Sequence, residues 1–365
     1  MAGEEGASLG VMTVLFAAGG TGGHLYPAFA IAEALEARGD KAIFVGTRDR
    51  LEARLVPAAG YPLRTIAAYP LVRRFSFALL KTGVANLAGF FQSLRVLAQT
   101  QPDVVIATGG YVCVPLVLAA RARNALLRKR VPIALLEPNA VAGIASRALR
   151  PFADEVWDAQ TTGVPVRASL LRARPRAQAL ARLGLDPEKR TLFAVGASQG
   201  ARSINDAVIA LLKDGALPSG WQIVHVTGED DYARVRDAVG ERAAVHAYLD
   251  DPGNAYAAAD VVLSRAGAST LAELAALGIP AIVVPYPYAT EAHQQANAEA
   301  FAVHGAAIIV QDAALRSRLV HVFEEINVPG ALAAMRECAS IAPGRDAVST
   351  ILARIDRLVS RRTPA

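Results

Sequence analysis

Short apolar runs alternate with helical patterns along the first half of the chain. The apolar runs cover residues 11–18, 42–46, 104–107 and 133–136, and a helical pattern covers residues 28–38. Buried strands of a parallel sheet read as short continuous apolar runs, and helices join them in βαβ units. We therefore expect an α/β half that is built on a parallel sheet.

The same rhythm restarts in the second half, where strand-like runs cover residues 191–195, 223–226, 261–263 and 281–284. The stretch around Pro165 separates the halves, because proline and glycine stop regular structure. We place the domain boundary there, near Arg167. The expected domains are residues 1–167 and residues 168–343, and a helical segment at residues 344–365 follows them.

Composition restricts the class of protein. The chain has 365 residues, 53% hydrophobic and 19% charged, which is typical of about two globular domains and excludes a disordered chain. Cys113 and Cys338 lack the spacing of a metal site or a redox pair, which indicates a reducing compartment. The N-terminus is acidic, unlike a signal peptide, and no run reaches the roughly 18 apolar residues of a membrane span.

Two glycine-rich turns each follow an apolar run and open a helical pattern. They read GGTGGH at residues 19–24 and GASQGA at residues 196–201. The first N–H groups of a helix lack partners and its dipole is positive there, so we expect both turns to favour an anion such as a nucleotide diphosphate. Leu25 stands where the dinucleotide fingerprint needs its third glycine, which argues against a dehydrogenase.

Two side chains in these turns, and an arginine at the domain boundary, suit chemistry on a phosphorylated ligand. His24 is a candidate base, since an imidazole pKa of about 6.5 suits proton transfer near neutral pH, or else a capping or ligand-binding residue. Ser198 can donate to a phosphate oxygen or serve as a helix N-cap. Arg167 offers a planar fork for a diphosphate.

Polar clusters follow two later strands of the second half. Glu273 stands three residues after Thr270, which fits either a capping box or a carboxylate that accepts from ribose hydroxyls. Gln294 and Asn297 share one helical face, where their amides fit sugar hydroxyls, although such a pair can also face water.

Together, four segments resemble the MurG family of bacterial glycosyltransferases, from the first strand to about residue 310. The matching motifs are the first turn with His24 and Pro27, residues 198–201 with Asn205, residues 265–268 with Thr270 and Glu273, and His293-Gln294 with Asn297. Ala197 replaces a usual glycine and Pro138 a common glutamine, but neither departure removes a side chain with an assigned role. The resemblance implies an α/β GT-B fold of two Rossmann-like, doubly wound parallel-sheet domains that face a cleft, with the C-terminal helix crossing back to the first domain.

The resemblance also implies a function: transfer of N-acetylglucosamine from UDP-N-acetylglucosamine to the C4 hydroxyl of an undecaprenyl-pyrophosphoryl-muramoyl-peptide, with inversion. The second domain would bind the donor, through Glu273 at the ribose, Ser198 and Arg167 at the diphosphate, and the Leu249 backbone at uracil. Gln294 and Asn297 would hold the transferred sugar. The remaining expected contacts are Ala268, Ser269, Thr270, Leu271 and Ala272 beside Glu273, and Thr21, Gly22, Gly23 and Asn139 in the first domain.

For the chemistry, we expect His24 to act as the base and no metal or other cofactor to take part, since no carboxylate pair stands at a metal-binding spacing near the turns. Helix-start amides, Ser198 and Arg167 would then stabilise the leaving diphosphate. Nucleic acid is not an expected partner.

Residues 71–98 fit either a membrane interface or a buried helix with a charged outer face. All of the basic excess of the chain lies in its first 168 residues, and a lipid acceptor also favours an anionic membrane surface. We expect peripheral attachment to the cytoplasmic face of the inner membrane, with cell-wall synthesis proteins as partners and roles in cell shape and division. The interfacial side chains would be Phe75, Phe77, Phe90 and Phe91 with Arg73, Arg74 and Lys81.

Three alternatives stay open from the sequence: another GT-B glycolipid glycosyltransferase, a UDP-N-acetylglucosamine 2-epimerase, and a sugar-nucleotide sensor without turnover. Residues 108–111 and 137–139, on the expected acceptor side, favour the muramoyl-lipid enzyme over these alternatives.

Overall fold

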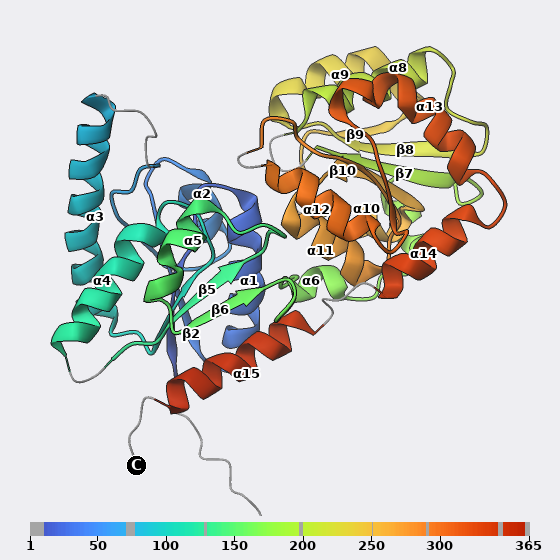
Figure 1. The fold of residues 1–365 in the computed structure, drawn as a ribbon. Coiled ribbons are helices and arrows are strands. Elements are labelled where there is room, and N and C mark those ends of the chain that lie inside the picture. Colours follow the sequence, from blue (N-terminus) through green and yellow to red (C-terminus); the bar gives the residue numbers. More distant parts are fainter. Residues whose placement is uncertain are drawn as a thin grey trace, which may run out of the picture. The chain divides into compact units, whose positions relative to one another are not determined.

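The chain forms two compact units in the computed structural model (Figure 1). The structure describes residues 11–70, 77–127, 130–196, 200–249, 251–289, 292–341 and 346–361. Unit 1 comprises the chain up to Pro138, residues Ala142–Thr162 and the chain from Asp346 onward. Unit 2 comprises Asn139–Val141 and Gly163–Arg345.

Unit 1 is built on a six-stranded parallel sheet with the strand order β3-β2-β1-β4-β5-β6. Its central strands are apolar on both faces because helices cover both sides. The strands are β1 (Thr13–Ala17), β2 (Lys41–Gly46), β3 (Leu63–Thr65), β4 (Val104–Ala107), β5 (Ile133–Glu137) and β6 (Glu155–Asp158).

Two buried clusters in unit 1 follow from the alternation of side chains along β1. Phe16 belongs to the cluster beneath α1, whereas Leu15 belongs to the cluster beneath α4. The helices of this unit are α1 (Gly22–Ala37), α2 (Leu51–Ala58), α3 (Phe77–Thr100), α4 (Cys113–Leu126), α5 (Ile144–Leu149), η1 (Arg150–Phe152) and α15 (Ala347–Ser360).

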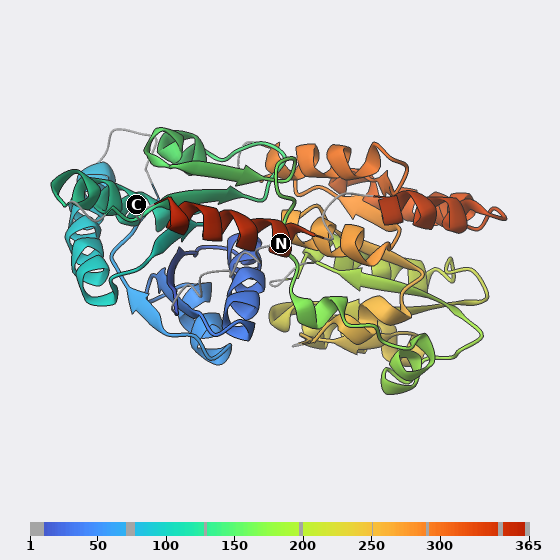
Figure 2. The same ribbon diagram turned by 90° about the horizontal axis from the view of Figure 1, so that it is seen from below.

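The C-terminal helix α15 contributes to the core of unit 1 and lies beside α1 (Figure 2). Ile351 and Ile355 are fully buried in the same cluster as Phe16. Asp356 accepts hydrogen bonds from Arg38, just beyond the end of α1, at 2.9 and 3.1 Å. The last helix is therefore part of the core that supports the first glycine turn.

Unit 2 repeats the architecture with the parallel strand order β12-β11-β10-β7-β8-β9. Its strands are β7 (Arg190–Val195), β8 (Trp221–Val226), β9 (Ala244–His246), β10 (Val261–Arg265), β11 (Ala281–Val284) and β12 (Ala307–Ile309). Its main helices are α6 (Ala168–Leu171), α7 (Arg176–Arg182), α8 (Arg202–Lys213), α9 (Tyr232–Val239), α10 (Gly253–Ala258), α11 (Ala268–Leu277), α12 (His293–Ala302), α13 (Leu315–Ile326) and α14 (Ala331–Ile341), with short helices η2 (Glu229–Asp231), η3 (Gly240–Arg242) and η5 (Asp312–Ala314).

All eight apolar runs predicted as strands are strands, so the α/β prediction is confirmed. The four strands that the pattern does not predict are β3, β6, β9 and β12, which are the two edges of each sheet. Edge strands have one neighbour and are partly exposed, so they do not read as continuous apolar runs. The helix predicted from residue 28 begins earlier, at Gly22, because glycines and Pro27 weaken the helical pattern of its first turns.

Candidate active site

The first glycine turn leads from β1 into α1 and places His24 in the first turn of that helix. His24 Nδ1 lies 2.8 Å from the carbonyl oxygen of Thr108, just beyond β4. Because a carbonyl only accepts, Nδ1 donates, and the neutral ring carries its lone pair on Nε2. The Thr108 hydroxyl donates to the His24 carbonyl at 2.7 Å, so one residue fixes both the ring and the backbone of His24.

Two glycines after β4 let this segment approach the turn closely. Gly109 and Gly110 have φ angles of 106° and 83°, which favour glycine. A Cβ atom on Gly109 would overlap the His24 ring, and one on Gly110 would lie 2.6 Å from the Gly19 carbonyl oxygen. The sequence assigns residues 108–111 to the acceptor side, and the structure brings them against His24.

Gly20 lies in the first glycine turn, one residue before Thr21, the N-cap residue of α1. Its N–H donates to the buried carboxylate of Glu52, on α2, at 3.0 Å. The Glu52 carboxylate therefore accepts from a backbone N–H of the turn, which is then not available to an anionic ligand. Glu52 has no motif around it, and only its position in the fold reveals the contact.

Thr21, Gly22 and Gly23 lie at the carboxyl end of β1, at the start of α1. Thr21 is the exposed N-cap residue of α1, and its carbonyl accepts from the N–H groups of His24 and Leu25 at 3.2 and 3.3 Å. The structure therefore groups the three predicted residues with His24 at one end of the sheet, where open α/β sheets bind ligands.

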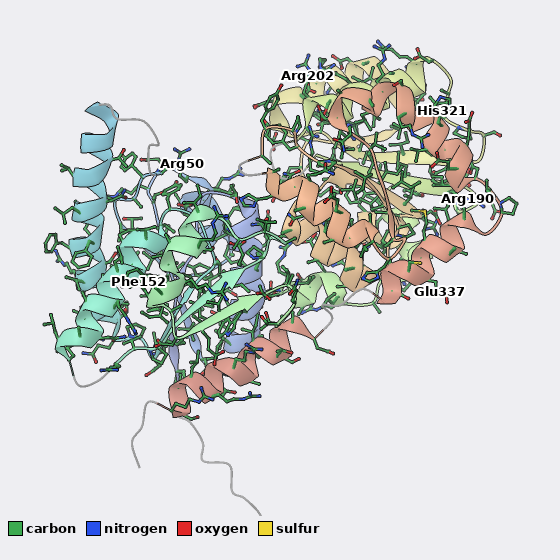
Figure 3. The ribbon with its side chains drawn as sticks, in the orientation of Figure 1. Arg50, Phe152, Arg190, Arg202, His321 and Glu337 are labelled. Carbon is green, nitrogen blue, oxygen red and sulfur yellow. The ribbon has the colours of Figure 1, made fainter. Side chains whose placement is uncertain are left out.

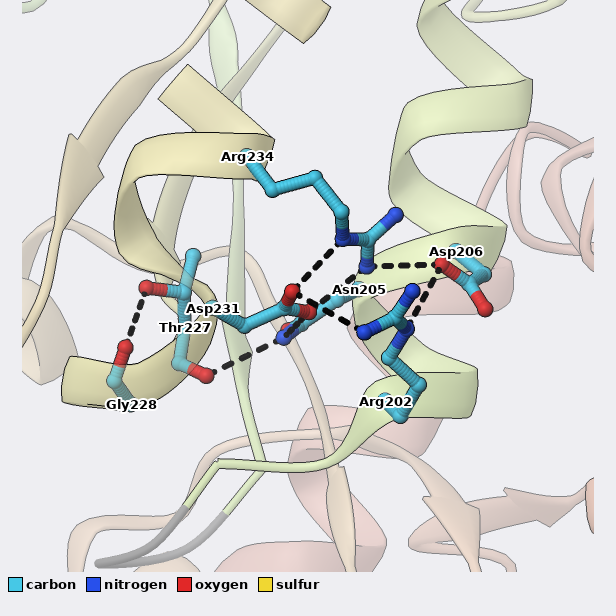
Figure 4. A network of polar contacts seen from close by, with 7 residues as sticks. All are labelled: Arg202, Asn205, Asp206, Thr227, Gly228, Asp231 and Arg234. Carbon is cyan, nitrogen blue, oxygen red and sulfur yellow. Dashed lines mark hydrogen bonds and ion pairs between the residues drawn. The ribbon is translucent and has the colours of Figure 1, made fainter. Parts of the chain in front are cut away.

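The second glycine turn rests on the end of β8 in unit 2. Ser198 and its neighbours Ala197 and Gln199 lie outside the described residues. A Cβ atom on Gly200 would overlap the carbonyl oxygen of Thr227. Asn205, on α8, donates to the same carbonyl at 3.0 Å and to Asp231 at 2.7 Å, so the second motif joins the turn to the next strand (Figure 4).

Charged side chains reinforce this junction on its outer side. Arg234 donates two hydrogen bonds of 2.6 Å to Asp231, and Arg202 lies 3.5 Å from the same carboxylate (Figure 4). The hydrogen bonds from Arg234, with help from Asn205, lower the pKa of Asp231 to about 2. Asp231 is therefore ionised at any physiological pH and anchors the start of α8.

Glu273, on α11, is a carboxylate with a strongly perturbed pKa. Burial raises its pKa to about 7, although a hydrogen bond from Tyr256 and the charge of Arg167 act in the opposite direction. The Tyr256 hydroxyl donates to Glu273 Oε2 at 2.8 Å. The structure thus brings the predicted residues Glu273 and Arg167 together, and it adds Tyr256, which the sequence does not indicate.

Glu273 does not form a capping box with Thr270. The N-cap residue of α11 is Gly267, so Thr270 is the third residue inside the helix and makes no cap. Of the two interpretations that the spacing allowed, the structural one is wrong. The predicted contact residues Ala268, Ser269, Thr270, Leu271 and Ala272 form the first turns of α11, directly after β10.

Known proteins match the chain over both units. The glycosyltransferase family 28 N-terminal domain matches residues 14–157, and the glycosyltransferase family 28 C-terminal domain matches residues 191–351. A Halothermothrix orenii protein, UDP-N-acetylglucosamine--N-acetylmuramyl-(pentapeptide) pyrophosphoryl-undecaprenol N-acetylglucosamine transferase, is 39% identical over 86% of this chain and 90% of its own. A protein of the same name from Desulforudis audaxviator is 37% identical over 96% of this chain and 100% of its own.

The crystal structure of Acinetobacter baumannii MurG is similar with a TM-score of 0.74 and 27% identity, over 95% of this chain and 99% of that one. The chain belongs to the MurG family. Spinosyn forosaminyltransferase SpnP, at 16% identity and a TM-score of 0.61, shares the fold alone. The predicted α/β GT-B glycosyltransferase fold is confirmed.

Within the MurG motifs, Arg265 connects elements rather than lining an open surface. It is 8% exposed, and it donates to Asp312 at 2.5 Å and to Ser203 at 2.9 Å. Its guanidinium also lies 5.4 Å from the ring centre of Tyr286. The third motif of the family therefore fixes the end of β10 to α8 and to the segment after β11.

The amides of the fourth MurG motif have partners within unit 2. Gln294 accepts from the Tyr286 N–H at 2.9 Å. Asn297 is 5% exposed and donates to the carbonyl of Ala266 at 3.2 Å and to Asn139 at 3.1 Å. The alternative that the pair faces water is therefore wrong for Asn297, which fixes the start of the third motif.

Leu249 follows β9 and packs against a buried cluster of unit 2. The Gly228 N–H donates to the Ala247 carbonyl at 3.1 Å, so the segment that carries Leu249 is joined to the end of β8. Within the described ranges, no group of three His, Cys, Asp or Glu side chains stands close enough to hold a metal ion.

Proposed function

We propose that the protein transfers N-acetylglucosamine from UDP-N-acetylglucosamine to the C4 hydroxyl of an undecaprenyl-pyrophosphoryl-muramoyl-peptide in peptidoglycan synthesis, with inversion. Membership in the MurG family supports the donor and the acceptor. The observation that supports the chemistry is the hydrogen bond of 2.8 Å from His24 Nδ1 to the Thr108 carbonyl oxygen.

His24 acts as the general base in this proposal. Nε2 accepts the proton of the acceptor hydroxyl while its oxygen bonds to C1 of the sugar and the C1–O bond to UDP breaks. A positioned base of this kind contributes about 10²- to 10⁴-fold to the rate. The hydrogen bond to Thr108 also stabilises the imidazolium that results, since both ring nitrogens then donate.

The donor is held by unit 2. Glu273 accepts from the ribose hydroxyls, the Leu249 backbone contacts uracil, and Gln294 holds the sugar, while the buried Asn297 acts on this site through its hydrogen bond to the Ala266 carbonyl. Arg167, Ser198 and the start of α8 stabilise the diphosphate as negative charge develops on it, because a helix N-terminus and a guanidinium are preorganised for an anion. In unit 1, Thr21, Gly22 and Gly23 line the acceptor beside His24.

The outer face of α3 supports attachment to a membrane (Figure 1). Val84, Leu87 and Phe91 are 63%, 58% and 60% exposed, and their spacing places them on one face, followed by exposed Arg95. A buried helix with a charged outer face does not expose three large apolar side chains in a row. Phe152, on η1 of the same unit, is 37% exposed (Figure 3).

Not every predicted interfacial residue contributes to this face. Phe90 is half-buried and packs edge-on against Phe91, with ring centres 5.5 Å apart. Arg73, Arg74, Phe75 and the side chains of Phe77 and Lys81 lie outside the described residues. Among the described helices, none is long and apolar enough to cross a membrane. We propose peripheral binding to anionic lipid on the cytoplasmic face, beside other cell-wall synthesis proteins.

Incubation with labelled UDP-N-acetylglucosamine, with and without the lipid acceptor, tests the reaction. We expect label in the lipid fraction only when the acceptor is present. Release of an epimer without acceptor would indicate a 2-epimerase, and binding without any product would indicate a sensor. Either result would overturn the proposed function.

A further inference from the structure

We infer that Glu52 is a positioning residue for the first glycine turn and, through it, for His24. Glu52 is fully buried and lies in the first turn of α2. In the sequence it belongs to none of the motifs that carry the family resemblance. The inference rests on the proposed function where it concerns the rate of transfer, and on the geometry of unit 1 where it concerns the turn.

The carboxylate joins the ends of two neighbouring strands. Glu52 Oε2 accepts from the Gly20 N–H at 3.0 Å, in the turn after β1. Glu52 Oε1 accepts from the Thr47 N–H at 2.9 Å and from the Thr47 hydroxyl at 2.7 Å, after β2. Three donors therefore surround a buried carboxylate, which is how a charge is tolerated inside a protein.

Two glycines are required because Glu52 occupies this place. A Cβ atom on Gly19 would lie 2.8 Å from Glu52 Oε1, and one on Gly46 would lie 2.5 Å from Glu52 Cγ. The first glycine of the turn thus leaves room for the Glu52 carboxylate. This explains a glycine that the sequence assigns to anion binding.

The turn is held from two sides. Glu52 fixes Gly20, whose φ of 89° sets the direction of the chain as it enters α1. On the other side, Gly110 packs against the Gly19 carbonyl and Thr108 fixes His24. A displacement of about 1 Å at a catalytic group can cost about 10²-fold in rate, so the support of this turn matters for transfer.

Glu52→Gln is the most direct test. The amide has the same shape, but its single oxygen can accept from only one of the two backbone N–H groups. We expect kcat to fall at least tenfold while the KM for UDP-N-acetylglucosamine changes less than twofold, because the proposed donor contacts lie in unit 2. We also expect amide hydrogen exchange in residues 19–24 to accelerate at least tenfold, with exchange in residues 200–213 unchanged.

Thr47→Val is the matched control. It removes one hydrogen bond from the same carboxylate but leaves Gly20 paired with Glu52. We expect its kcat to stay within threefold of the wild type and exchange in residues 19–24 to stay unchanged. Glu52→Asp serves if Glu52→Gln does not fold: the shorter carboxylate keeps its charge beside Thr47 but does not reach Gly20, so it should show the same loss of kcat and the same faster exchange.

Hydrogen exchange needs no substrate, so it separates this inference from the proposed function. If the wild type transfers no sugar, the proposed function fails and the exchange data alone decide whether Glu52 holds the turn. The inference is overturned if Glu52→Gln leaves exchange in residues 19–24 unchanged. The inference is also overturned if Glu52→Gln and Thr47→Val lower kcat equally, or if exchange in Glu52→Gln accelerates evenly over the chain. Either result indicates general destabilisation.

Discussion

Tyr256 donates its phenolic hydrogen to Glu273 Oε2 across 2.8 Å, from α10 to α11. The two residues are 17 positions apart, and only Glu273 belongs to a recognisable motif. The hydrogen bond favours the ionised carboxylate, whereas burial favours the protonated one and raises the pKa to about 7. Glu273, which we assign to the ribose, therefore changes between its protonated and ionised forms near neutral pH.

Tyr256→Phe should shift the pH dependence of nucleotide binding. Removal of the hydroxyl takes away a group that lowers the pKa of Glu273, so this pKa should rise further. If the ionised carboxylate binds the ribose, UDP affinity should increase with pH in both proteins, with a higher midpoint in the variant. Calorimetric titration with UDP between pH 6 and pH 9 measures both midpoints, and identical midpoints would remove Tyr256 from the site.

Glu273→Gln should weaken UDP binding about tenfold and make it independent of pH in this range, because an amide cannot gain the charge that strengthens hydrogen bonds to the diol. Calorimetry at pH 8 measures the affinity. Unchanged affinity would show that Glu273 does not contact the ribose.

The same variant should be more stable than the wild type at high pH. The pKa of Glu273 is about 7 in the folded protein, above its ordinary value of 4.5, so wild-type stability falls as pH rises between these values. Glutamine removes this cost, by about 1–2 kcal/mol at pH 8 after allowance for partial solvent exposure. Thermal unfolding of both proteins at pH 5 and pH 8 should show the advantage only at pH 8.

His24→Ala should lower kcat by about 10²- to 10⁴-fold, as expected for the loss of a general base, with little change in UDP affinity. The reason is that His24 belongs to unit 1, whereas the residues assigned to the donor belong to unit 2. Steady-state kinetics with the lipid acceptor and calorimetry with UDP measure the two effects. Normal turnover in the variant would remove His24 from the mechanism.

Leu87→Asp and Phe91→Asp should reduce binding to anionic vesicles at low salt, because each places a charge on the exposed apolar face of α3. Val303→Asp is the matched control, since Val303 is 72% exposed on unit 2. Flotation of the three variants with the wild type measures retention. Equal retention of all four proteins would count against α3 as the membrane surface.

The apolar pattern of the sequence predicts the interior of the fold better than its borders. The eight interior strands are buried on both faces, and that burial is visible as continuous apolar runs. The edge strands β3, β6, β9 and β12 are partly exposed to solvent, so their sequences do not form continuous apolar runs.

The sequence alone determined the two parallel sheets, the turns at their carboxyl ends and the identity of His24 and Glu273 as candidates, because these depend on residue type and local spacing. The tertiary structure decided which distant groups act on them: Thr108 on His24, Tyr256 on Glu273, and Glu52 on Gly20. A hydrogen bond between segments far apart in the chain depends on how helices and strands pack, and no local pattern of residues records that packing.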